Sequence, residues 1–210
     1  MRLSHLIAGA VAALAVSAPA LAQQTVAIVG GRVLTGTSVI ENGTVVIRDG
    51  RIASIDPGRS RIAGAWDLEG DWLLPGLIEL HTDNLERLFT PRPGVRWPAD
   101  AAMLTHDAHV AGAGITTVCD AVCVGFHGGR SERLDYLALS LAVLRRAQTA
   151  GALKAEHFLH LRLELTDPHM LELFEPLMGE PSLRLVSFME HTPGQRQWRD
   201  LDKLRGWKDS

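Results

Sequence analysis

Imidazole and carboxylate side chains stand at or near the ends of four short apolar runs that have the composition of strands. His81 and Asp83 close the first run, LLPGLIEL, and side chains two apart point to the same side of a strand. Both could therefore contact one ion, and mixed nitrogen and oxygen ligands suit a divalent metal such as zinc, manganese or iron. The later runs contribute Asp120, His160, Arg162, Glu164, Glu190 and His191.

The elements that must position these residues are strands alternating with helices. Such alternation indicates right-handed βαβ units and a parallel sheet, whose ligands bind at the carboxyl ends of the strands. Four units are about half of a closed (β/α)₈ barrel, so the pattern fits the front half of a barrel or a smaller open sheet. The expected strands cover 72–80, 115–125, 157–165 and 183–190, and the expected helices cover 99–114, 131–151 and 167–179.

A second group of side chains has the chemistry to bind phosphate. The segment LERLFTPRPGVRWPAD is predicted to be a loop, in which prolines restrict the backbone and guanidinium groups offer forked donors to phosphate oxygens. No G-x-x-x-x-G-K-[ST] motif is present, so a P-loop is not the means of binding. Any one of these arginines is also compatible with a solvated surface position. The candidates are Arg87, Arg92, Arg96 and Arg196.

The N-terminus has the features of a secretory signal peptide. Arg2 precedes an apolar core over 6–16, and Ala20-Leu21-Ala22 fits the small-residue cleavage rule. A membrane anchor is the alternative, although Pro19 interrupts an apolar core that is short for a membrane span. Residues 1–22 are therefore expected to direct export to the periplasm or beyond, with contact to a membrane only during export.

Residues 23–70 form a different kind of segment, rich in short β runs broken by glycine. Asp49-Gly50 lies between TVVIR and RIASI and predicts a two-residue hairpin turn. We expect a small antiparallel sheet or sandwich here, followed by the α/β segment over 71–210. The net charge of -3 and pI near 6.3 give no argument for nucleic acid or an anionic membrane surface as a partner.

The two cysteines, Cys119 and Cys123, lie in one predicted strand. Four residues along a strand span roughly 13 Å, which is beyond the reach of a disulfide. We therefore expect two buried free thiols.

The segment from Asp67 to Gln197 resembles the amidohydrolase superfamily of metal-dependent (β/α)₈ hydrolases. The resemblance rests on GDWLLPGLIELHTDN, FTPRPGVRWPA, HDAHVAGAGITTVCDAV, AEHFLHLRLEL and HTPGQRQW. More narrowly, these motifs are similar to those of the superfamily's diphosphatases of phosphonate catabolism. The resemblance implies a metal-dependent hydrolase that releases pyrophosphate from a phosphorylated small molecule, a ribose 1-methylphosphonate 5-triphosphate.

The resemblance also implies roles for single residues. His81 and Asp83 would occupy the metal pair of the first strand, where most of the superfamily has H-x-H. Glu164 would be a carboxylate ligand of the third strand, and Glu190 the bridging carboxylate of the fourth, with His191 as a further candidate. The later strands of the superfamily supply more ligands and the catalytic residue, so the catalytic residue of this chain is not assigned.

Three alternatives follow from the same observations. With four of eight units, the chain is expected to be truncated and weakly active alone, and to act as a homo-oligomer or with a complementing chain. Hydrolysis of C–N bonds in cyclic amides is a second possibility, against which the arginine loop and Asp83 argue. A non-catalytic fragment that needs a partner chain is a third. The resemblance itself implies a cytoplasmic protein rather than an exported one.

Overall fold

The computed structural model describes residues 25–92, 94–126 and 132–208. The chain divides into two compact units, Met1–Pro75 and Gly76–Ser210, each with its own sheet. The expected signal peptide lies outside the described residues. In the part of the chain that the structure describes, no helix has the length and apolar character needed to cross a membrane.

The first unit is one sheet whose three long strands are antiparallel, as predicted. Asp49 and Gly50 form the expected hairpin turn: both have positive φ, 51° and 71°, and Arg48 pairs with Arg51 across it. Two short strands add to β1 in parallel and extend the unit to Pro75, past the expected boundary at residue 70. The strands are β1 (Thr25–Leu34), β2 (Val39–Arg48), β3 (Arg51–Asp56), β4 (Trp66–Asp67) and β5 (Trp72–Leu73).

The second unit has a parallel sheet of four strands, β6 (Leu77–Thr82), β7 (Ile115–Val124), β8 (Glu156–Glu164) and β9 (Leu183–Met189). The helical elements between them are α1 (Asn84–Phe89), α2 (Ala99–Gly112), α3 (Glu132–Thr149), α4 (Met170–Phe174) and the 3₁₀ helix η1 (Glu175–Leu177). After β9 come the 3₁₀ helix η2 (Arg196–Trp198) and α5 (Leu201–Lys208).

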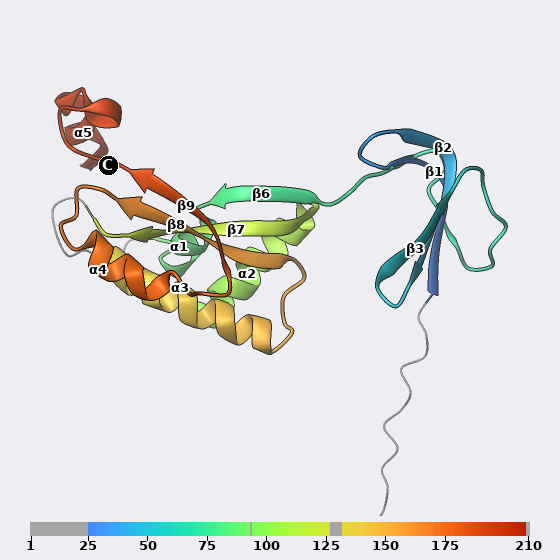
Figure 1. Cartoon of the computed structure of the whole chain (residues 1–210), viewed down its shortest axis with the longest axis horizontal. Coiled ribbons are helices and arrows are strands. Elements are labelled where there is room, and N and C mark those ends of the chain that lie inside the picture. The colour runs from blue at the N-terminus through green and yellow to red at the C-terminus, as the bar shows by residue number, and fades with distance from the viewer. Residues whose placement is uncertain (1–24, 93, 127–131, 209–210) are drawn as a thin grey trace, which may run out of the picture. The chain divides into compact units, whose positions relative to one another are not determined.

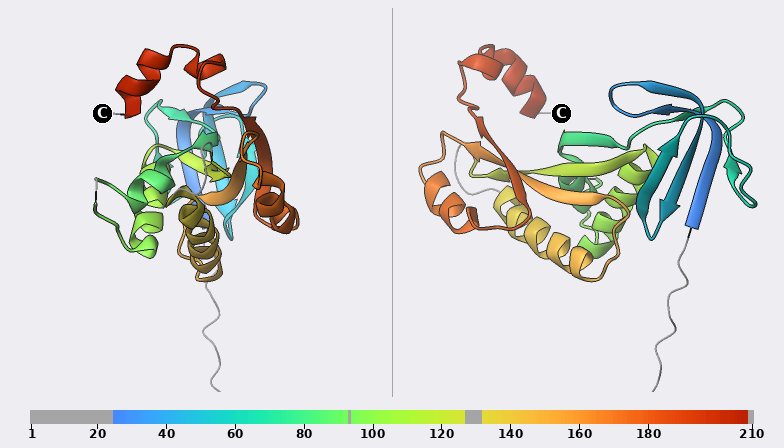
Figure 2. Two further views of the ribbon diagram at one scale, coloured as in Figure 1. Left: turned by 90° about the vertical axis from the view of Figure 1, so that its left-hand side faces the viewer. Right: turned by 45° about the vertical axis from the view of Figure 1, so that its right-hand side comes forward.

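The order of these strands decides between the two expected architectures. The strands lie side by side in chain order, β6-β7-β8-β9, and helices α1 to α4 cover one face of the sheet (Figure 1). Seen along the strands, these helices fan around the curved sheet (Figure 2). A doubly wound open sheet would have helices on both faces, whereas a barrel winds in one direction. The prediction of an α/β half-barrel is therefore confirmed.

Alternation along β7 and β8 builds the core between the sheet and the helices. Cys119 and Cys123 of β7 point to the face of the sheet away from the helices. Both are buried free thiols, as predicted. The side chains on the helix-facing side are almost fully buried because Phe89, Met103 and Leu144 from three helices cover them. They are Val122, Val124, Leu159, Leu161 and Leu163, whereas Val118 packs with Val110 and Ala155 in a second cluster.

Three helical elements were not expected from the sequence. The segment predicted to be a loop after the first strand begins with α1, which buries Leu85 and Phe89. Their spacing of four places both on one face of a helix, a signal that the prolines beyond them obscured. The segment after β9 contains η2 and α5, neither of which is among the expected helices, and Leu204 of α5 is buried.

An ion pair between α3 and the segment just before β9 gives a testable prediction. Glu180 is buried and accepts a hydrogen bond from the guanidinium of Arg145, which lowers the pKa of Glu180 from its ordinary 4.5. Because the folded pKa is the lower one, the contribution to stability is complete above about pH 4.5 and is lost as the pH falls through the folded value.

Glu180→Gln should therefore lower the free energy of unfolding by about 1–2 kcal/mol at pH 7. The loss is no larger because Arg145 is largely exposed and solvent screens the pair. At pH 3 the loss should be smaller, because protonation of Glu180 already weakens the pair. Urea unfolding at the two pH values measures both quantities. Asp100→Asn is the matched control: it breaks the exposed pair of Arg146 with Asp100 and should change stability by at most about 0.5 kcal/mol. Equal effects of the two variants would contradict the prediction.

Candidate functional site

His81 and Asp83 lie at the carboxyl end of β6, beside two residues of β8. The rings of His81 and His160 meet edge to face with centroids 5.0 Å apart, and His81 Nε2 lies 3.6 Å from Asp83 Oδ2. Arg162 Nη1 donates to Asp83 Oδ1 at 2.8 Å. The structure therefore brings the first-strand pair together with the inward-facing residues of the third predicted strand.

The protonation of His160 follows from its contacts. Its Nδ1 donates to the backbone oxygen of Leu80 at 3.0 Å, and its Nε2 lies 2.8 Å from Ser187 Oγ. Burial lowers the pKa of His160, assisted by the nearby ring of His81 and by Arg162, although the bond to Leu80 opposes the shift. A neutral ring with Nδ1 protonated, which can accept a hydrogen bond from Ser187, fits these contacts.

A second group lies where β8 and β9 end. Glu164 is 2% exposed and accepts hydrogen bonds from Thr166 Oγ1 and from His191 Nδ1. Burial would raise the pKa of Glu164, but these hydrogen bonds outweigh burial and the pKa is lowered. Nε2 of His191 makes no hydrogen bond within the described residues. The buried carboxylate thus holds the ring through Nδ1 and leaves Nε2 available to a ligand.

Glu190 belongs to the same end of the sheet. Its Oε1 accepts a hydrogen bond from the backbone N–H of Thr192 at 2.9 Å, and Arg196 Nε lies 3.0 Å from its Oε2. The hydrogen bonds from Thr192 lower the pKa of Glu190. Arg196, expected to bind phosphate, is therefore paired with a carboxylate.

The five predicted metal ligands form two pairs and a neighbour rather than one cluster. His81 lies beside Asp83, Glu164 is bonded to His191, and Glu190 follows β9. Within the described ranges, one group of three such residues has its ligand atoms within 4.8 Å of one another. That group is His106, Asp120 and His157, none of which is among the five predicted ligands. The predicted residues thus share the carboxyl ends of the strands without closing a common coordination shell.

The predicted phosphate-binding arginines lie in different places. Arg87 lines a pocket of about 480 Å³ together with Asp83, Glu86, Thr90, Tyr136 and Arg162. Arg96 stands over the ring of Tyr136, 5.8 Å from its centroid, and Arg92 lies in a short bridge with Val95. Sequence reasoning missed Thr90 and Tyr136, whose hydroxyls hydrogen-bond to each other across 46 residues of chain, a contact without a local sequence signal.

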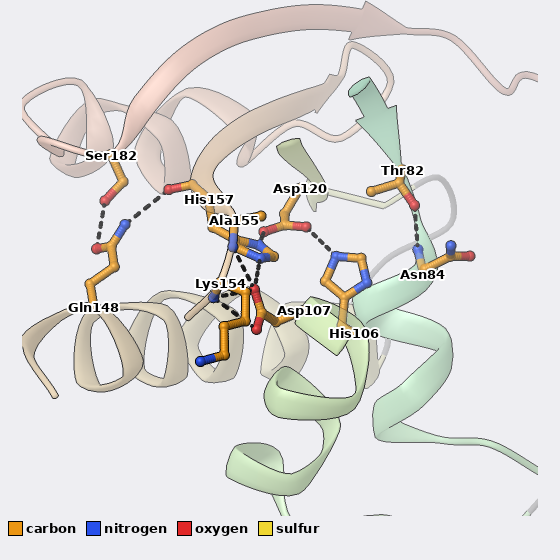
Figure 3. A network of polar contacts seen from close by, with 10 residues as sticks. All are labelled: Thr82, Asn84, His106, Asp107, Asp120, Gln148, Lys154, Ala155, His157 and Ser182. Atoms are coloured by element: carbon orange, nitrogen blue, oxygen red, sulfur yellow. Dashed lines mark hydrogen bonds and ion pairs between the residues drawn. The ribbon is translucent and has the colours of Figure 1, made fainter. Parts of the chain in front are cut away.

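A buried polar network between the sheet and α2 was also missed. His106 Nε2 lies 2.6 Å from Asp120 Oδ1, and His157 Nδ1 lies 2.8 Å from Asp120 Oδ2 (Figure 3). On its other side His157 Nε2 lies 3.3 Å from Asp107, which also accepts hydrogen bonds from the backbone N–H groups of Lys154 and Ala155. The network therefore ties α2, β7 and the start of β8 together.

The placement of Asp120 corrects one expectation. Asp120 was expected at the strand ends with the other ionisable residues, but it lies in the middle of β7 and is fully buried on the helix-facing side. Its alternation with Val118 and Val122 could have shown this. Burial would raise the pKa of Asp120, but hydrogen bonds from His106 and His157 outweigh burial and the pKa is lowered.

Comparisons with known proteins identify the class of fold. A scan of family models gives no match to the chain. The N-isopropylammelide isopropylaminohydrolase of Burkholderia multivorans superposes with a TM-score of 0.50 at 19% identity, over 77% of this chain and 44% of that chain. An N-acetyl-D-glucosamine-6-phosphate deacetylase of Mycobacterium smegmatis gives 0.50 at 18% identity, over 82% and 44%. The chain therefore shares its fold with these two hydrolases over less than half of each.

One particular relative matches most of the chain. Over 171 residues the chain is 47% identical to the alpha-D-ribose 1-methylphosphonate 5-triphosphate diphosphatase of Escherichia coli (strain K12), which covers 80% of this chain. A dihydroorotase of Anaeromyxobacter sp. (strain K) is 38% identical over 125 residues, or 58% of this chain. The resemblance inferred from the motifs is confirmed. The chain spans 45% of the length of the diphosphatase and 26% of the dihydroorotase.

Proposed function

We propose that this chain contributes part of the active site of a metal-dependent hydrolase that releases pyrophosphate from a ribose 1-methylphosphonate 5-triphosphate. The observation that carries the proposal is the group at the end of β6 and β8, where His81 and Asp83 meet His160 and Arg162. Similarity to a diphosphatase over 80% of the chain supports the choice of substrate.

The donor atoms at the strand ends fit a divalent metal. His81 and Asp83 offer an imidazole and a carboxylate on one side, and Glu164, Glu190 and His191 offer the same types on the other. The bond from His191 Nδ1 to Glu164 has the form in which a carboxylate orients a metal-binding histidine. A bound divalent ion would activate water as a nucleophile and offset charge on phosphoryl oxygens. Zinc, manganese and iron all suit this donor set.

The chain's own residues have separate tasks in this proposal. Arg162 holds Asp83 by a hydrogen bond, which fixes the carboxylate at the end of β6. Glu164 fixes the ring of His191 and leaves its Nε2 directed away from the carboxylate. Both tasks orient groups before substrate arrives, which lowers the entropic barrier to a reaction.

The two edge strands of the half-barrel, β6 and β9, expose apolar side chains. Leu77, Ile78 and Leu80 of β6 and Val186 and Phe188 of β9 are exposed apolar side chains, and β6 and β9 are the edges of the sheet. Exposed edges of this kind call for a covering element. We propose that rapid turnover requires further β/α units against these edges, from a longer form of the protein or a complementing copy. Rapid turnover by the 210-residue chain, shown to be monomeric by size-exclusion chromatography, would contradict this.

An assay of pyrophosphate release tests the proposed reaction. Purified protein is supplied in turn with zinc, manganese or iron, and offered the ribosyl 5-triphosphate beside a cyclic amide such as dihydroorotate. We expect metal-dependent release of pyrophosphate and no ring opening. Ring opening without pyrophosphate would favour the C–N hydrolases, to which the dihydroorotase similarity points.

A further inference from the structure

The pocket beside Asp83 combines donors that suit an oxyanion with two carboxylates, Asp83 and Glu86. It brings together two guanidinium groups, from Arg87 of α1 and Arg162 of β8. It also contains two hydroxyls, from Thr90 at the C-terminal end of α1 and from Tyr136 of α3. Forked guanidinium donors and hydroxyls are the groups that bind phosphoryl oxygens. The pocket has room for more than one phosphoryl group, at about 480 Å³.

The two guanidinium groups retain donors for a ligand. The side chain of Arg87 is exposed and makes no hydrogen bond or ion pair within the described residues. Arg162 uses Nη1 for Asp83 and for a long contact to Cys123 Sγ, whereas its Nη2 and Nε make no hydrogen bond to described residues. Arg162 can therefore hold Asp83 and an anion at the same time.

Tyr136 organises the wall of the pocket. Its ring stacks on Phe89 with centroids 5.9 Å apart, and its hydroxyl is bonded to Thr90 at the end of α1. The guanidinium of Arg96 also lies over this ring. Because the ring is buried and held by these contacts, the hydroxyl has a fixed position, as a specific oxyanion site requires.

We propose that this pocket binds the terminal diphosphate of the substrate, with Arg87, Arg162 and the Tyr136 hydroxyl as its donors. This rests on the proposed function, because the diphosphatase supplies the class of ligand. The pocket includes Asp83, so the diphosphate lies next to the group proposed to hold the metal. The proposal separates the predicted arginines: Arg87 contacts the ligand, whereas Arg92 and Arg196 lie outside the pocket.

The test is binding of inorganic pyrophosphate to the 210-residue chain, measured by calorimetry in metal-free buffer of low salt. We expect Arg87→Ala and Arg162→Gln each to weaken binding by roughly tenfold or more, and Tyr136→Phe by about three- to tenfold. Arg87→Lys should restore part of the affinity, because it keeps the charge and loses the fork. Orthophosphate should bind more weakly than pyrophosphate.

Arg92→Ala and Arg196→Ala are matched controls, and both should leave pyrophosphate binding unchanged. Arg87 is exposed, so its variants should fold normally, which circular dichroism checks. Equal losses in the controls and in Arg87→Ala, no loss in Arg87→Ala, or no binding by the unmodified chain would overturn the proposal. Pyrophosphate binding that depends on Arg87 in a chain that hydrolyses no triphosphate would reject the proposed reaction and keep this site.

Discussion

Replacing Asp120 by alanine is expected to lower the free energy of unfolding by about 3–5 kcal/mol, the range for removing one member of a buried charged group. Asp120 is fully buried, and its two oxygens accept hydrogen bonds from His106 and His157. Its removal leaves two buried ring N–H groups without an acceptor and leaves a cavity between α2 and β7.

Urea unfolding in buffer with a chelator measures this loss. Asp100→Ala is the control, because Asp100 is an exposed carboxylate of α2, the helix that supplies His106, and its loss should cost at most about 0.5 kcal/mol. Should Asp120→Ala fail to fold, Asp120→Asn keeps one acceptor and should give a smaller, measurable loss. A urea midpoint for Asp120→Ala equal to that of the unchanged chain would show that the network does not contribute to stability.

Replacing Asp83 by alanine is expected to lower affinity for a divalent metal by at least about 100-fold, the upper end of the effect of groups that only support a ligand. Two causes act together. The change removes a proposed oxygen ligand, and it leaves the Arg162 guanidinium without its carboxylate, so that a positive charge repels the ion. Pyrophosphate release should fall with metal occupancy.

Metal content after dialysis and manganese titration by electron paramagnetic resonance measure this effect. Asp83→His should retain binding, because imidazole is also a metal ligand. Asp100→Ala should bind metal normally. If Asp83→Ala bound manganese as tightly as the unchanged chain, Asp83 would not be a ligand, and its role would be limited to the ion pair with Arg162.

Periodicity in the sequence was sufficient for the elements whose pattern is local. The strands β7 to β9 and the helices α2 and α3 lie close to their predicted ranges, since alternation and helical spacing are set by neighbouring residues. The Asp49-Gly50 turn was predictable for the same reason. The helix α1 was missed because three prolines nearby dominated the composition of its segment, although Leu85 and Phe89 had helical spacing.

What the sequence determined by itself is the alternation of strands with helices and the types of residue at the strand ends. It placed His81, Glu164 and Glu190 at or next to the carboxyl ends of parallel strands, and its motifs identified the resemblance. Only the tertiary structure decided which of these groups meet. It paired Asp83 with Arg162 and Glu164 with His191, and it brought His106 and His157 to Asp120. The physical reason is that alternation fixes a side chain's face, whereas its partner depends on strand register and on helices distant in the chain.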